Sequence, residues 1–155
     1  MKNKIIISIV AVVILIATIF TVIIINHNSK QGNDGAQSYD NVEDAAKNAS
    51  FFLEYPDRLC GIPATGFESN SSMFEVRYGN ENYIRKTLGV ADNSGNKTEY
   101  AENNKQSVNG ITVTFKGSDG LVYLAVWTDN NFAFTISVTN GVVADEMTEY
   151  IEATR

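Results

Sequence analysis

Covalent catalysis would need an activated nucleophile with a base in reach, and the chain has few side chains for that chemistry. Cys60 is its single cysteine and His27 its single histidine. His27 closely follows an apolar amino-terminal segment, whereas Cys60 lies in the part predicted to be globular. The sequence therefore argues against Ser-His and Cys-His mechanisms, and Cys60 is interpreted as a buried or loop thiol.

Neither of the two segments that could suggest a metal site matches a known metal-binding motif. Cys60-Gly61-Ile62-Pro63 lacks the second cysteine of a zinc knuckle or a redox dithiol. Residues 92–99 place oxygen atoms at alternate positions, as calcium loops do. However, Lys97 stands where an EF-hand loop needs glycine, and Asn103 stands where it needs a bidentate glutamate. We predict no metal and no cofactor.

Acidic residues are numerous, but carboxylates act on glycosidic bonds only as pairs at a defined separation. The chain has 18 Asp and Glu residues, so accidental pairs are expected, and their separations cannot be read from sequence. It contains no phosphate-binding loop and no dinucleotide-binding fingerprint. We predict no catalytic residues and no enzyme activity, and we keep an envelope hydrolase as the second alternative.

The densest apolar stretch, residues 120–137, contains the single tryptophan, Trp127. Strand alternation places Tyr123 and Trp127 on one face, and Leu124 and Val126 on the other. A strand that is apolar on both sides is normally covered on both sides, or else lines a groove. Trp127 is interpreted as a core residue, and the face with Tyr123 and Trp127 is the candidate apolar groove.

An antiparallel sheet must position these side chains. Asn109-Gly110 lies between two strand-like runs and predicts a two-residue hairpin turn, whereas residues 92–104 are polar and predict a loop. Apolar residues alternate with polar ones, or form short apolar runs between turns, over five further segments. We predict strands over residues 73–78, 83–88, 111–116, 121–127 and 132–138, the last three forming a meander.

Two helices complete the predicted domain. Asp40 or Asn41 can cap a helix that runs to about Asn48, and residues 51–53 after it are expected to enter the core. Residues 144–153 have acids in the first turn and apolar residues at helical spacing. The predicted fold class is therefore α+β, an antiparallel sheet of five or six strands with the carboxy-terminal helix packed on it.

The amino-terminal segment Ile5 to Ile25 contains no charged residue. As a helix it would span about 31 Å, enough to cross a hydrocarbon core of about 30 Å. It is longer than the apolar core of a signal peptide, and no small-residue cleavage motif follows it. We predict an uncleaved signal anchor, a single transmembrane helix in contact with the lipid bilayer.

Positive charge sets the predicted orientation, because Lys2 and Lys4 precede the apolar segment whereas only Lys30 closely follows it. The amino terminus is expected to be cytoplasmic, and the carboxy-terminal domain extracytoplasmic in the cell membrane. The predicted organisation is a cytoplasmic stub (1–4), a transmembrane anchor (5–25), a polar tether (26–38) and an extracytoplasmic α+β domain (39–155).

The external part is strongly acidic. Three of the twelve Lys and Arg residues, but none of the eighteen Asp and Glu residues, lie within the first thirty positions. The remainder therefore carries a formal charge of about −9. Nucleic acids and anionic lipid headgroups both favour clustered positive charge, so neither is expected as a partner of this domain.

Several of these segments also resemble a known family. They include Asn109-Gly110, Gly117-Ser118-Asp119-Gly120, Leu124 to Asp129, Phe134 to Ser137 and Asp145-Glu146-Met147. From about Val42 to its end the chain resembles the bacterial extracytoplasmic domains grouped as domain of unknown function 4367. The resemblance implies a domain behind a single membrane anchor, in some proteins joined to an anti-sigma regulator. It offers no catalytic residues to carry over.

The function predicted from these observations is a membrane-anchored binding or sensing accessory module of a bacterial envelope. With only Met1 to Lys4 predicted inside the cell, any signal would have to pass through a membrane or envelope protein partner. The alternative is a carrier or chaperone for an apolar ligand or lipoprotein, which would use the face with Tyr123 and Trp127.

Overall fold

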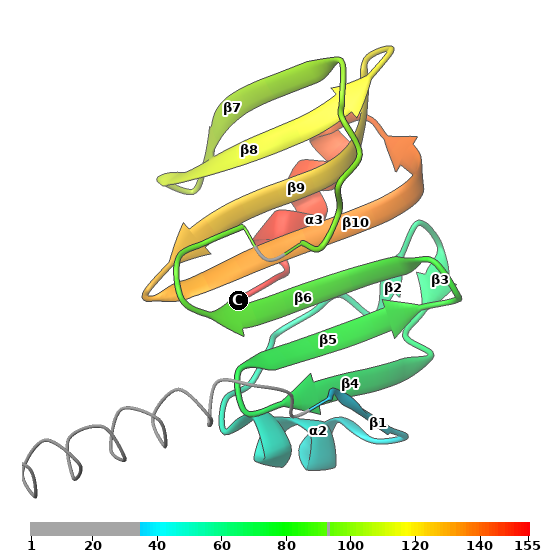
Figure 1. Cartoon of the computed structure of the whole chain (residues 1–155). Coiled ribbons are helices and arrows are strands. Elements are labelled where there is room, and N and C mark those ends of the chain that lie inside the picture. The colour runs from blue at the N-terminus through cyan, green and yellow to red at the C-terminus, as the bar shows by residue number, and fades with distance from the viewer. Residues whose placement is uncertain (1–34, 93) are drawn as a thin grey trace, which may run out of the picture. The chain divides into compact units, whose positions relative to one another are not determined.

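The computed structural model describes residues 35–92 and 94–155 (Figure 1). The predicted stub and transmembrane anchor, together with residues 26–34 of the predicted tether, lie outside the described residues. Within the described part of the chain, no helix is long and apolar enough to span a bilayer. Residues 35–155 form one compact unit.

An antiparallel sheet of eight strands dominates this unit, in the order β1-β4-β5-β6-β10-β9-β8-β7. The prediction of five or six strands was therefore too low. The short ribbon of β2 (Arg58–Leu59) and β3 (Ile62–Pro63) is separate from the sheet. The strands of the sheet are β1 (Gln37–Tyr39), β4 (Gly66–Asn70), β5 (Met73–Tyr78), β6 (Asn82–Leu88), β7 (Glu102–Val108), β8 (Ile111–Ser118), β9 (Leu121–Asp129) and β10 (Phe132–Val142).

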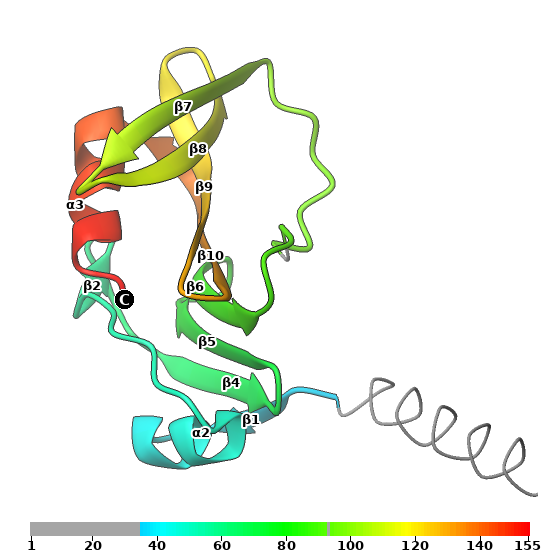
Figure 2. The same ribbon diagram turned by 90° about the vertical axis from the view of Figure 1, so that its left-hand side faces the viewer.

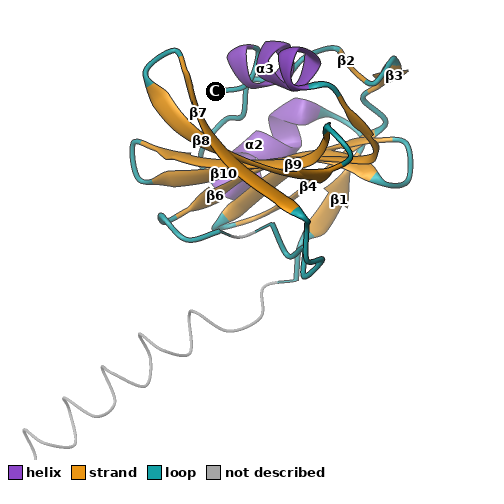
Figure 3. Ribbon diagram, turned by 90° about the horizontal axis from the view of Figure 1, so that it is seen from above, coloured by secondary structure: helices purple, strands orange, loops and turns teal. Residues whose placement is uncertain are grey.

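Two helices, α2 (Val42–Ala49) and α3 (Ala144–Glu152), lie on the same face of the sheet (Figure 3). Each turns its buried residues toward the apolar core, Ala45 and Ala49 from α2 and Met147 and Ile151 from α3. The antiparallel sheet with a carboxy-terminal helix packed on it is confirmed.

The segment after α2 only partly follows the prediction that residues 51–53 enter the core. Leu53 is fully buried and Phe51 is half-buried against the core. Phe52 is 49 % exposed, and its ring meets the ring of Phe74 at an interplanar angle of 62°. Residues 51–53 form neither helix nor strand, and only part of this apolar run is buried.

The turns follow their local sequences. Asn109 and Gly110 have φ values of 51° and 83°, the positive values that a two-residue hairpin turn requires. Asp119-Gly120 and Asn130-Asn131 make the two other turns of the meander, again with positive φ values. The loop predicted over residues 92–104 ends earlier, because Glu102 already pairs with Gly117.

A β-bulge in β9 overturns the prediction that Tyr123 and Trp127 share a face. Leu124 lies opposite Lys116 and Val122 lies opposite Gly117, so Tyr123 has no opposite residue on β8. Side chains alternate with a period of two, and one extra residue therefore reverses the faces beyond it. Trp127 belongs to the core beneath α3, whereas Tyr123 stacks on Tyr100 outside that core.

The start of α2 yields a first stability prediction. The Asn41 side chain accepts a hydrogen bond from the Asp44 backbone N–H at 2.9 Å, which satisfies one of the unpaired amides of the first turn. Asn41→Ala is expected to lower the free energy of unfolding by about 1 kcal/mol in urea denaturation. Asn103→Ala, at an exposed site on β7, is the control; equal effects of the two changes would contradict the capping role.

Candidate ligand-binding groove

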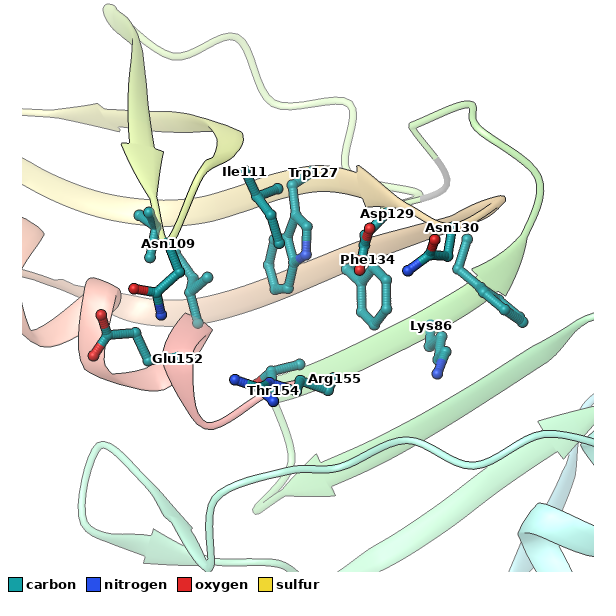
Figure 4. A pocket seen from close by; sticks show the side chains of 13 residues that line it. Lys86, Asn109, Ile111, Trp127, Asp129, Asn130, Phe134, Glu152, Thr154 and Arg155 are labelled. Atoms are coloured by element: carbon teal, nitrogen blue, oxygen red, sulfur yellow. The ribbon is translucent and has the colours of Figure 1, made fainter.

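A groove of about 490 Å³ opens on the helix-bearing face, between the sheet and the end of α3 (Figure 4). Its floor is apolar and comes from β8, β9 and β10, and its rim comes from two hairpin turns, β6 and the end of the chain. The floor residues are Ile111, Trp127, Phe132 and Phe134. The polar rim residues include Lys86, Asn109, Asp129, Asn130, Glu152 and Arg155.

The aromatic floor follows from the strand register. Trp127 and Phe134 are directly opposite in the β9–β10 pair. Their rings stack with centroids 5.1 Å apart and an interplanar angle of 4°. Directly opposite aromatic pairs stabilise a sheet, so this pair contributes to the stability of the β9–β10 pairing as well as to the floor. Trp127 is only 5 % exposed, so it lines the floor without protruding into the groove.

Lys86 is the unusual member of this face. It lies opposite Phe134 in the β6–β10 pair, and its Nζ donates a hydrogen bond to the Phe52 carbonyl oxygen at 2.7 Å. Nζ also lies 4.6 Å from the ring centroid of Phe132. Burial lowers the pKa of Lys86, an effect that the nearby carboxylates of Glu54 and Asp129 oppose. The ring face of Phe132 and the Phe52 carbonyl oxygen offset part of the cost of burying this ammonium group at the edge of an apolar surface.

The rim combines both charges with neutral amides. Asp129 is the last residue of β9, Asn130 lies in the β9–β10 turn, and Asn109 lies in the β7–β8 turn. The backbone of Arg155 is held in place by two hydrogen bonds with Glu54, at 2.7 and 3.2 Å. Donors and acceptors therefore surround an apolar floor, an arrangement that suits a ligand with an apolar group and nearby polar atoms.

The sequence located only part of this groove. Trp127 lines it, but Tyr123 lies on the other face of the sheet because of the bulge in β9. Lys86 was missed as a groove residue. The register of β6 against β10 would have revealed Lys86, because that register places its charged side chain among apolar neighbours.

Cys60 lies in the turn between β2 and β3, with a positive φ of 52°. Its backbone N–H donates to the Tyr150 hydroxyl oxygen at 2.9 Å, and that hydroxyl donates to Glu146 Oε1 at 2.5 Å. Burial raises the pKa of the Cys60 thiol, and the charge of Glu146 raises it further. A protonated thiol is a poor nucleophile, so this geometry favours the interpretation of Cys60 as a structural thiol.

The remaining chemical candidates are not brought together. His27 lies outside the described residues. In the loop compared with calcium-binding sites, Asp92 forms an ion pair with Lys116 at 2.7 Å and accepts a hydrogen bond from the Ser94 backbone N–H at 3.0 Å. Across residues 35–92 and 94–155, no three His, Cys, Asp or Glu side chains are grouped as a metal site would require.

Comparison with known proteins gives one match. A family model described as "Domain of unknown function (DUF4367)" matches residues 60–152, from the β2–β3 turn to the end of α3. This match begins later than the resemblance predicted from about Val42. No curated protein and no solved structure is significantly similar to the chain.

Proposed function

This chain belongs to the DUF4367 family, and from that premise we propose that it is a binding module whose ligand site is the groove at Trp127. The family description assigns no activity, so the argument rests on the groove itself. One observation carries it: a stacked aromatic floor is surrounded by a rim of mixed charges and amides.

The ligand class proposed for this groove is an extended peptide segment with an apolar side chain. The floor of Trp127, Phe132 and Phe134 would bury the side chain, at a gain of about 1.5–3 kcal/mol for a fully buried one. The amides of Asn109 and Asn130 can each donate and accept, as a peptide backbone requires. A bare acyl chain would leave these groups unused, so the rim favours a peptide over the apolar cargo of a carrier.

The proposed setting follows from the amino-terminal sequence. The uncharged segment from Ile5 to Ile25 would anchor the chain in a membrane, with the domain outside the cell. The module would then capture a segment of a membrane or envelope protein and take part in sensing or assembly through that partner. No catalytic step is included in this proposal.

The test uses the full chain in phosphatidylcholine vesicles and follows the emission of Trp127, its single tryptophan. The probes are capped tripeptides with a central leucine or a central serine, and sodium decanoate. The leucine peptide is expected to cause a saturable change in emission, and the serine peptide is not. Phe132→Ala is expected to weaken leucine-peptide binding at least about fivefold, since it removes much of the floor.

Phe52→Ala is the matched control, because it removes the same side chain from an exposed site that does not line the groove. Its affinity for the leucine peptide should stay within about twofold of the unmodified chain. Saturable binding of decanoate without peptide binding would favour the carrier alternative. Equal weakening by both substitutions would contradict the assignment of the groove.

A further inference from the structure

A second hollow, of about 480 Å³, is lined by Asn96 and residues 98–101 together with parts of β8, β9 and β10. The segment between β6 and β7 that supplies Asn96 and residues 98–101 lies on the side of the sheet away from α3 (Figure 2). The two hollows share no lining residue. A ligand here would therefore be separate from the peptide proposed for the groove at Trp127.

Two tyrosines form the aromatic part of this hollow. Tyr123 reaches it because the bulge turns its side chain away from the core, and its ring stacks on Tyr100 with centroids 6.2 Å apart and 30° between the planes. Gly141 supports this position, since a Cβ there would come within 3.0 Å of the Tyr123 ring. The absence of a side chain at Gly141 thus leaves space for the ring.

The loop that carries Tyr100 is held in place by side chains of the sheet. Tyr83 Oη and Arg85 Nη1 both donate to the Ser94 carbonyl oxygen, at 2.7 and 3.1 Å. Asn96 Nδ2 donates to the Tyr100 hydroxyl oxygen at 2.8 Å. These hydrogen bonds hold the Tyr100 ring in position before any ligand binds. Ordering it in advance lowers the entropic cost of binding.

The rest of the lining is polar and almost uncharged. Thr98, Ser118 and Thr139 contribute hydroxyl groups that make no hydrogen bond to any other described residue. Glu99 is the only acidic residue in the lining, and neither Lys nor Arg is among the described residues that line the hollow. Phosphorylated and other anionic ligands therefore have no cationic partner here.

We propose that this hollow binds a neutral sugar ring of an oligosaccharide. A pyranose has C–H groups on its faces, which pack on aromatic rings, and hydroxyl groups around its edge, which both donate and accept hydrogen bonds. Tyr100 and Tyr123 supply the aromatic surface, and the hydroxyls of Thr98, Ser118 and Thr139 supply partners for the edge. The carboxylate of Glu99 adds an acceptor for a sugar hydroxyl.

The test is isothermal titration calorimetry of the full chain in phosphatidylcholine vesicles. The probes are the β-1,4-linked hexamers of glucose and of N-acetylglucosamine, with adenosine as a flat aromatic ligand of another class. At least one hexamer is expected to bind saturably. Tyr100→Ala should weaken that binding at least about tenfold, because it removes one of two stacking rings. Tyr100→Phe keeps the ring and should retain affinity within about threefold.

Tyr39→Ala is the matched control, since Tyr39 lies on β1 and lines neither hollow. It should leave sugar affinity within about twofold, and circular dichroism should show that each variant is folded. The absence of saturable binding by either hexamer would overturn the proposal. So would binding of adenosine alone, or sugar binding that Tyr100→Ala leaves unchanged. Each of these results leaves the peptide groove open to its own test.

Discussion

Gly117→Ala is expected to lower the free energy of unfolding by about 3 kcal/mol, the largest effect predicted for any single methyl group added to the chain. A Cβ at Gly117 would lie 1.9 Å from the carbonyl oxygen of Leu121 and 2.9 Å from its carbonyl carbon. Both are backbone atoms next to the bulge, so no side-chain rotation relieves the overlap. The pairing of β8 with β9 would have to shift instead.

Urea denaturation of the full chain in detergent micelles, followed by Trp127 emission, measures this effect. Gly66→Ala is the matched control, because a Cβ at Gly66 would have no atom within 4 Å and φ is not positive there. Its expected change is within about 0.5 kcal/mol. If the two variants were equally stable, the close approach of Gly117 to Leu121 would be contradicted.

The same substitution bears on the second hollow. The bulge that brings Leu121 close to Gly117 also turns Tyr123 toward Tyr100. A shift of the β8–β9 pairing would therefore displace one of the two rings of the proposed sugar site. Folded Gly117→Ala protein is expected to lose sugar affinity, whereas Gly66→Ala protein is expected to keep it.

Glu75→Gln is the second substitution with a large expected effect, a loss of about 3 kcal/mol of stability. Glu75 is 1 % exposed on the face of the sheet opposite α3, and its carboxylate forms ion pairs with Arg85 Nη2 at 2.5 Å and with Arg77 Nη2 at 3.1 Å. Glutamine has the same shape but no charge. Both guanidinium groups would then face an amide that cannot neutralise them.

Partial exposure of the two arginines sets the size of this effect. Their side chains are 22 % exposed at Arg85 and 40 % at Arg77, so water can screen part of the unbalanced charge. The loss therefore falls at the low end of the range for broken buried ion pairs. Arg85 also donates to the Ser94 carbonyl, so the variant is expected to loosen the loop that carries Tyr100.

Glu68→Gln is the control for Glu75→Gln. Glu68 pairs with Arg77 Nε at 2.8 Å, but its side chain is 26 % exposed, and a partly solvated pair contributes only about 0.5 kcal/mol. The same urea denaturation measures both variants. A loss for Glu75→Gln no larger than that for Glu68→Gln would show that the buried carboxylate contributes little.

Structural elements that depend on interactions between residues close in the chain can be predicted well from the sequence. Asn109-Gly110 forms its hairpin turn, because these two residues tolerate the positive φ values found there. Asn41 caps α2 through its own side chain, which is again a local interaction. The apolar alternation over residues 132–138 predicts the buried face of β10, and the family resemblance is confirmed over residues 60–152.

Strands without an apolar face were harder to predict. β7 (Glu102–Val108) is exposed over most of its length and has no apolar alternation, so the sequence predicts a loop for its beginning. β4 (Gly66–Asn70) and β1 (Gln37–Tyr39) are short and mixed in character. Backbone pairing with a neighbouring strand holds these segments in the sheet, and a single sequence does not show that pairing.

By itself, the sequence determined the family, the meander of β8, β9 and β10 with its turns, and the core role of Trp127. Only the tertiary structure decided that Tyr123 and Trp127 belong to opposite faces and to two different hollows. The physical reason is the bulge: alternation along one strand places side chains correctly until a residue lacks a partner on the next strand. That register depends on contacts between β8 and β9, which no local pattern records.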